Sequence, residues 1–154
     1  MRISFDLDDT LICYNPQVPR EPNRVPLWWR WKEQEPLRLG TVDLAQQLQE
    51  AGHELMVYTT SLRNPAQVKR WLGFYGFRAA AVINAELHAK AISHKERHYS
   101  KMPWRFDVAL HVDDENFVEV GQKFGMSWLL IATHDLEWTA KILKAVQDIE
   151  MQKR

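Results

Sequence analysis

Three acidic side chains follow the first apolar run of the chain. Asp6, Asp8 and Asp9 lie in the decapeptide Arg2–Leu11, RISFDLDDTL. Carboxylates gathered at the end of a buried strand repel one another and lose hydration, so their charge needs compensation. A divalent cation is the simplest source of that compensation. We therefore expect a cation-dependent active site that begins in the first ten residues.

Five short apolar runs predict strands covered on both faces, because most of them are near-continuous rather than alternating. They span residues 2–7, 54–59, 79–84, 108–113 and 127–132. Helical patterns lie between them, over residues 41–51, 64–76, 116–124 and 135–151. Asn64 before Pro65 is typical of a helix start, and Gly52 of a helix end. The alternation predicts an α/β fold, a Rossmann-like three-layer sandwich with a five-stranded, mostly parallel sheet.

Polar side chains end three of these predicted strands. The residues are Asp6 and Asp8, Thr59 and Thr60, and Asp113 and Asp114. In a parallel sheet the ligand lies beyond the carboxyl ends of the strands, which share one edge. We therefore expect the three sets to converge on one site.

The converging residues suit phosphoryl transfer. Asp6 would attack phosphorus to form an aspartyl-phosphate, and Asp8 would protonate the leaving group and then activate water. Asp113 and Asp114 would hold the cation, and their hard oxygen ligands favour Mg²⁺ over zinc. Thr59 would donate a hydrogen bond to a phosphoryl oxygen.

Further residues are needed around this centre. Thr10 would orient Asp8 or close the turn after the strand. Substrate contacts are predicted for Thr10, Thr60 and Arg63. A lysine must balance the charge on the pentavalent phosphorus. The candidates are Lys90, Lys95 and Lys101.

The motifs together resemble the haloacid dehalogenase (HAD) superfamily of aspartate-nucleophile phosphatases. They are Asp6-Leu7-Asp8-Asp9-Thr10, Thr59 closing a strand, a lysine, and His111-Val112-Asp113-Asp114. The resemblance covers nearly the whole chain, from the first predicted strand through the fifth. It implies that Asp6 is the nucleophile and Asp8 the acid/base.

The resemblance also implies a set of cation ligands. These are Asp6, the backbone carbonyl of Asp8, and Asp114, while Asp113 either binds the cation or supports a ligand. The family's lysine emerges just before the fourth strand, which favours Lys101, with Lys95 as the alternative.

Residues 12–38, here called the flap segment, interrupt the strand–helix pattern. The segment holds five prolines and Trp28, Trp29 and Trp31, so a regular helix cannot run through it. A loop this long in a compact domain is usually functional, and we expect it to fold over the site. The tryptophans would anchor the loop on the body or stack on substrate. Since no space remains for an inserted cap domain, we expect one capless domain over residues 1–154.

Composition sets the cellular context. The 20 basic and 20 acidic residues cancel, which gives no overall attraction to nucleic acid or membrane. Cys13 is the single cysteine, so no internal disulfide forms and a reducing compartment is expected. Six residues separate Cys13 from Arg20, which excludes a Cys-x5-Arg phosphatase loop. With no secretory signal pattern and no apolar stretch near the roughly 20 residues that span a bilayer, we expect a cytoplasmic protein.

The sequence therefore predicts a Mg²⁺-dependent phosphatase that hydrolyses a phosphomonoester, with a small phosphorylated metabolite as the favoured substrate. Phosphoproteins and nucleic-acid ends are alternatives, because a capless site is open, although neutral charge makes nucleic acid less attractive. A HAD-like binding or regulatory protein with weak catalysis is the competing class. A homo-oligomer is left open. His111 is expected to be a hydrogen-bonded core residue.

Overall fold

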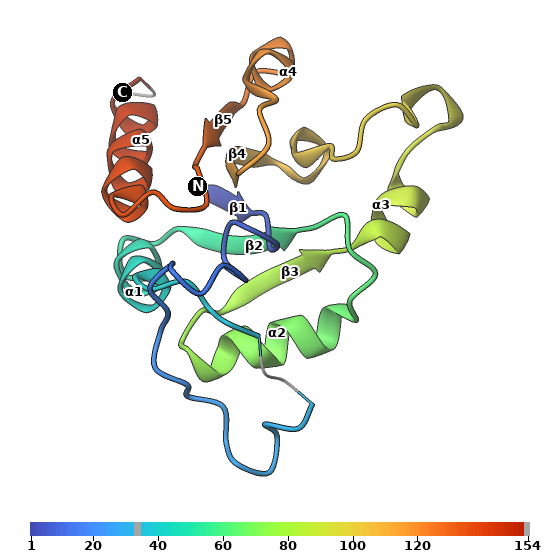
Figure 1. The fold of residues 1–154 in the computed structure, drawn as a ribbon. Helices are drawn as coiled ribbons and strands as arrows, with labels where there is room; N and C mark the ends of the chain where they lie inside the picture. The colour runs from blue at the N-terminus through green and yellow to red at the C-terminus, as the bar shows by residue number, and fades with distance from the viewer. Residues whose placement is uncertain (33–34, 153–154) are drawn as a thin grey trace.

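The computed structural model describes residues 1–32 and 35–152 (Figure 1). Its five strands are β1 (Arg2–Phe5), β2 (Glu54–Tyr58), β3 (Ala79–Ile83), β4 (Val108–Asp113) and β5 (Ser127–Leu130). They form one sheet in the order β3-β2-β1-β4-β5, and every neighbouring pair is parallel. The predicted Rossmann-like α/β fold is confirmed, with a sheet that is wholly parallel in the described residues.

Helices flank the sheet. They are α1 (Thr41–Glu50), α2 (Pro65–Phe74), α3 (Ala85–Ala91), α4 (Val118–Lys123) and α5 (Trp138–Gln152), with short 3₁₀ turns η1 (His94–Glu96) and η2 (Pro103–Phe106). The four predicted helices are confirmed, although α5 begins three residues later than the pattern indicated. Helix α3 was not predicted, because it has no buried residue and therefore no apolar stripe to detect.

Local signals at helix ends have the expected structural basis. The Asn64 side chain accepts hydrogen bonds from the N–H groups of Ala66 and Gln67, at 2.9 and 3.3 Å, with Pro65 at the first helical position of α2. Gly52 follows the end of α1 with φ +80°, a left-handed conformation that costs glycine little. These two signals fix where β2 begins and where α2 leaves the carboxyl edge of the sheet.

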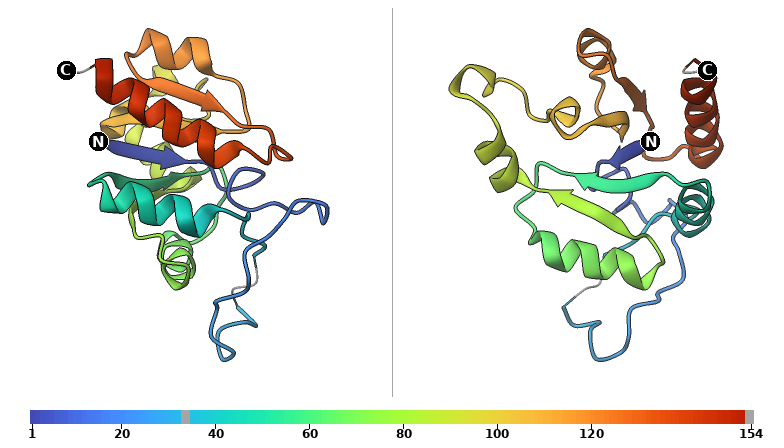
Figure 2. Two further views of the ribbon diagram at one scale, coloured as in Figure 1. Left: turned by 90° about the vertical axis from the view of Figure 1, so that its left-hand side faces the viewer. Right: turned by 180° about the vertical axis from the view of Figure 1, so that it is seen from behind.

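Successive strand residues point to opposite faces, which gives the sheet two apolar surfaces. On one face, Ile3, Phe5, Leu55, Val57, Leu110 and Val112 form a core with buried residues of α1, α2 and α5. On the other face, Met56, Tyr58 and Trp128 pack with Trp104 and Phe106 of η2. Figure 2 shows α1 and α5 together on one side of the sheet. This is the three-layer arrangement that the sequence predicted.

The flap segment leaves the carboxyl edge of the sheet and returns to it (Figure 2, left). Antiparallel bridges join Ile12 to Leu37 and Arg20 to Arg38, so residues of its first part pair with the residues at its end. Trp29 is partly buried against the core, and the Arg70 guanidinium of α2 lies 4.2 Å from its ring centre. Trp28 and Trp31 are each 74% exposed. Of the three tryptophans, Trp29 therefore anchors the segment on the body, at α2.

No helix among residues 1–32 and 35–152 has both the length and the apolar character that crossing a membrane requires.

Candidate metal and catalytic site

Three aspartates meet at the carboxyl edge of the sheet. Asp6 follows β1, Asp113 ends β4 and Asp114 follows it, and β1 and β4 are neighbours in the sheet. One carboxylate oxygen from each lies within 4.8 Å of the others, an arrangement that could hold a metal ion. The predicted convergence of the first and fourth strand ends is confirmed.

Lys101 lies between two of these carboxylates. Its Nζ is 2.6 Å from Oδ1 of Asp6 and 2.7 Å from Oδ2 of Asp113, and the residue is only 5% exposed. The other two lysines considered, Lys90 and Lys95, are exposed. The structure thus brings Lys101 to the nucleophile candidate, while its catalytic role stays a prediction.

The register of β1 against β4 brings Ser4, His111 and Asp113 into one chain of hydrogen bonds. Ser4 pairs with His111, and His111 and Asp113 share one face of β4 because they are two residues apart. Ser4 Oγ lies 2.6 Å from His111 Nδ1, and His111 Nε2 lies 2.9 Å from Asp113 Oδ2. Burial lowers the pKa of His111, which favours the neutral imidazole. These partners assign Nδ1 as the acceptor from Ser4 and Nε2–H as the donor to Asp113.

His111 is therefore a hydrogen-bonded core residue, as expected. Asp113 accepts from His111 and Lys101 at Oδ2, and its Oδ1 accepts from the Glu115 N–H at 3.0 Å. Donors on both oxygens fix the orientation of this carboxylate. Asp113 is thereby suited to hold Lys101 in place beside Asp6.

The aspartates carry more negative charge than Lys101 balances. Burial, together with the charge of Asp113, raises the pKa of Asp6 to about 7 against the opposing effect of Lys101. Burial and the charge of Asp113 raise the pKa of Asp114 to about 6. Burial alone would also raise the pKa of Asp113, but the hydrogen bond from His111 and the charge of Lys101 outweigh it and lower the value to about 2.

This donor set fits a divalent cation. Lys101 occupies one oxygen of Asp6, which leaves the other for a ligand. Asp114 is partly exposed at the edge of the sheet, where a hydrated ion could approach. A hard cation bound by carboxylates would offset the burial and the charge of Asp113 that raise the pKa values of Asp6 and Asp114.

The backbone turns sharply after Asp6. The N–H groups of Leu11 and Ile12 both donate to the carbonyl of Leu7, at 3.0 and 2.7 Å. Asp9 has φ +58°, a left-handed conformation that aspartate tolerates better than most residues. Asp9, which had no assigned chemistry, therefore has a structural place in this turn.

The side chain of Asp8 is not part of the three-aspartate group. Arg63 binds it with two parallel hydrogen bonds, Nη1 to Oδ2 at 2.7 Å and Nη2 to Oδ1 at 2.8 Å. Thr10 lies in the turn, but its buried hydroxyl has no hydrogen-bond partner among the residues that the structure describes. Arg63 rather than Thr10 therefore orients Asp8, and the predicted substrate contact of Arg63 stays a prediction.

Two residues of the flap segment that the sequence did not single out complete this arrangement. Arg63 Nη2 donates to the Tyr14 hydroxyl at 2.6 Å, and Arg63 Nε donates to Glu35 Oε1 at 3.2 Å. Neither Tyr14 nor Glu35 belongs to a motif or a periodic pattern. Nothing in the sequence could have placed them beside Asp8.

The threonines at the end of β2 differ in exposure. Thr59 is 1% exposed, and its Oγ1 accepts from the Ser61 N–H at 3.1 Å. Thr60 is exposed. Both lie at the carboxyl edge, as expected, and their contacts with a phosphate stay predictions.

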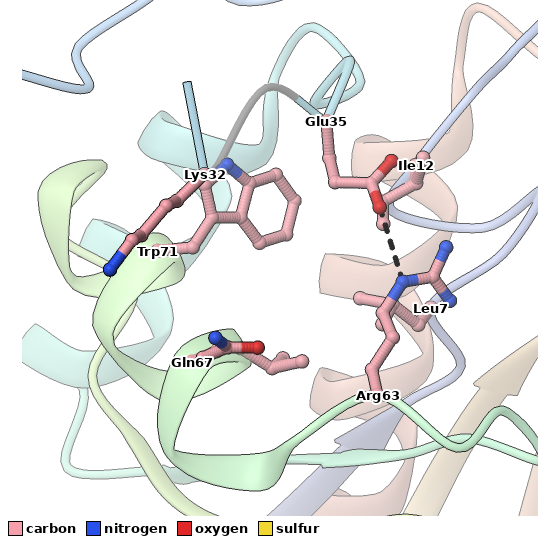
Figure 3. A pocket seen from close by; sticks show the side chains of 8 residues that line it. Leu7, Ile12, Lys32, Glu35, Arg63, Gln67 and Trp71 are labelled. Carbon is pink, nitrogen blue, oxygen red and sulfur yellow. Dashed lines mark hydrogen bonds and ion pairs between the residues drawn. The ribbon is translucent and has the colours of Figure 1, made fainter. Parts of the chain in front are cut away.

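A pocket lies between the flap segment and α2 (Figure 3). Its lining residues are Leu7, Ile12, Lys32, Glu35, Arg63, Gln67, Val68 and Trp71. Figure 3 shows Arg63 and Glu35 paired on one side of the space and Trp71 opposite them. Since Arg63 also binds Asp8, the pocket adjoins the candidate acid/base.

A scan against protein-family models finds no matching family, and a comparison with curated proteins finds no similar sequence. What is known of the site therefore comes from the fold and from its geometry. They show a five-stranded parallel α/β sheet that carries a buried acidic cluster, Asp6, Asp113 and Asp114, able to hold a metal ion.

Proposed function

We propose that the protein is a Mg²⁺-dependent phosphatase of the HAD type, formed by one capless domain, that hydrolyses a phosphomonoester through an aspartyl-phosphate. The observation that supports this most strongly is the position of Lys101 Nζ, within 2.7 Å of both Asp6 and Asp113. A nucleophile candidate, a balancing ammonium group and metal-binding carboxylates thus share one edge of the sheet.

The chemistry divides between two aspartates. The oxygen of Asp6 that does not bind the cation attacks phosphorus, and the bond from phosphorus to the leaving oxygen breaks as Asp8 donates a proton to that oxygen. Asp8, now a carboxylate, takes a proton from the water that attacks the aspartyl-phosphate. Inorganic phosphate leaves and Asp6 is regenerated.

The remaining residues of the site stabilise charge. Lys101 steadies Asp6 and offsets charge on the phosphoryl oxygens. Mg²⁺, held by Asp6, Asp114 and the backbone carbonyl of Asp8, would supply the positive charge that lets an anionic phosphate approach an anionic nucleophile.

The substrate that best suits this site is a small phosphorylated molecule. The pocket beside Arg63 is lined by apolar residues together with charged ones, which suits the organic part of a metabolite. The neutral net charge of the chain offers no general attraction to a polynucleotide.

The test is hydrolysis of p-nitrophenyl phosphate and of a panel of phosphorylated metabolites in Mg²⁺. We expect the Asp6→Asn variant to lose turnover while its circular dichroism spectrum and melting temperature stay close to those of the unaltered protein. EDTA should silence the enzyme and Mg²⁺ should restore it.

Turnover that survives Asp6→Asn would exclude Asp6 as the nucleophile, and indifference to EDTA would exclude the metal. Uptake of beryllium fluoride without hydrolysis of any panel member would favour the binding or regulatory alternative.

A further inference from the structure

The carboxylate of Asp8 lies in a closed network that joins three separate stretches of chain. Asp8 belongs to the turn after β1, Arg63 to the loop before α2, and Tyr14 and Glu35 to opposite ends of the flap segment. The Tyr14 hydroxyl lies 3.2 Å from Asp8 Oδ1 and 3.1 Å from Glu35 Oε2. Every member thus contacts at least two others.

The network holds Arg63 in one orientation. The planar guanidinium donates to Asp8 through Nη1 and Nη2, to Tyr14 through Nη2, and to Glu35 through Nε. Hydrogen bonds from Arg63 to Asp8, aided by the nearby Glu35, raise the pKa of Arg63, so the group keeps its charge. Because Tyr14 and Glu35 hold the Arg63 guanidinium, its two parallel hydrogen bonds also fix the plane of the Asp8 carboxylate.

Stability does not account for this arrangement. The side chains of Arg63, Asp8 and Glu35 are 26%, 39% and 33% exposed. Ion pairs at such partly exposed positions contribute little to folding, because water competes for both charges. The defined geometry is therefore better explained by a need to orient Asp8.

In this orientation Asp8 still has a position free for proton transfer. A carboxylate offers about four lone-pair positions, and Arg63 and Tyr14 use up to three of them. The remaining position is on Oδ2, which can carry the proton that is given to a leaving-group oxygen and can then accept a proton from a water. Proton transfer requires the partners to lie within about 3.2 Å, so a carboxylate free to rotate would spend much of its time misplaced.

We propose that Arg63, Tyr14 and Glu35 are positioning residues that hold Asp8 for proton transfer, so that two residues of the flap segment support the catalytic step. The inference rests on the proposed phosphatase function, in which Asp8 is the acid/base.

The experiment compares two substrates whose leaving groups differ in their need for a proton. p-Nitrophenolate departs readily without protonation, whereas phenolate depends more on a general acid. The variants are Tyr14→Phe, Glu35→Gln and Arg63→Lys. The matched control is Tyr99→Phe, which also deletes one hydroxyl but lies among Trp104 and Phe124 instead.

We expect kcat/KM, which covers the steps up to departure of the leaving group, to fall about 10-fold for phenyl phosphate in each variant, a fraction of the full general-acid effect. The fall for p-nitrophenyl phosphate should be clearly smaller, and Tyr99→Phe should change neither. Arg63→Lys should behave like the other two variants, because lysine keeps the charge but lacks the two-pronged donor.

The outcomes separate the inference from the proposed function. Absence of turnover in the unaltered protein overturns both. Turnover with unchanged variants overturns the inference alone, and so do equal losses on the two substrates, because a loss of folding or binding does not distinguish leaving groups. Melting temperatures identify a variant that fails to fold. If Arg63→Lys fails to fold, Tyr14→Phe decides the question, because it removes only one partly exposed hydroxyl.

Discussion

The Lys101→Met substitution removes a buried positive charge from between two buried carboxylates. The Lys101 side chain is 3% exposed, and those of Asp6 and Asp113 are 7% and 0% exposed. Methionine has a similar length and no charge, so it fills the space while leaving both acids without their shared partner. The substitution therefore tests whether this ammonium group balances the acidic cluster.

The expected loss follows from the burial of the pair. Removing one member of a buried ion pair typically costs about 3–5 kcal/mol, since the remaining charge is desolvated and unpaired. We expect a loss of that size in the free energy of unfolding at pH 8 in EDTA. Mg²⁺ should recover part of it, because a cation bound by Asp6 and Asp114 supplies the missing charge.

Urea unfolding followed by tryptophan fluorescence measures these free energies. The matched control is Lys95→Met, which makes the same change at an exposed position. A loss below about 1 kcal/mol, the range of exposed pairs, would refute the assignment of Lys101 as the balancing charge. Equal stabilisation of the variant and the unaltered protein by Mg²⁺ would refute the link between Lys101 and the cation.

Two further predictions concern the scaffold. Burial lowers the pKa of His53, so the unfolded chain binds a proton more readily than the folded one. Stability should therefore fall as the pH drops below about 6.5, by up to about 1.4 kcal/mol per pH unit for this group, and less steeply in His53→Gln, as urea titrations at pH 7.5 and 5.5 would show. Asn64→Ala should lower the free energy of unfolding by about 1 kcal/mol, because the first turn of α2 loses its cap, and an unchanged urea midpoint would contradict this.

The elements were predictable wherever the sequence carries a local periodic signal. Near-continuous apolar runs gave the five strands, and the Asn64-Pro65 pair marked the start of α2. Helix α3 was not predicted, because a helix that buries no side chain has no apolar stripe in its sequence. The start of α5 was placed too early because residues 135–137 fit the helical pattern but lie before the helix, with Leu136 and Glu137 in a turn.

The acidic cluster was predictable from topology. The carboxyl ends of parallel strands share one edge, so acids after the first and fourth strands had to meet if those strands were neighbours, as β1 and β4 are. Lys101 could not be separated from Lys95 by spacing alone. Lys101 lies in an irregular stretch before η2, and only the packing of that stretch brings its Nζ to Asp6 and Asp113.

The sequence by itself determined the α/β fold, the convergence of Asp6 with Asp113 and Asp114, and the need for a compensating charge. These follow from periodicity and from the repulsion of like charges, which are properties of short stretches of chain. Only the tertiary structure decided that Asp8 turns toward Arg63 and that Tyr14 and Glu35 surround the pair. Those contacts span up to 55 residues through loops without a repeating pattern, so their geometry exists only once the chain has packed.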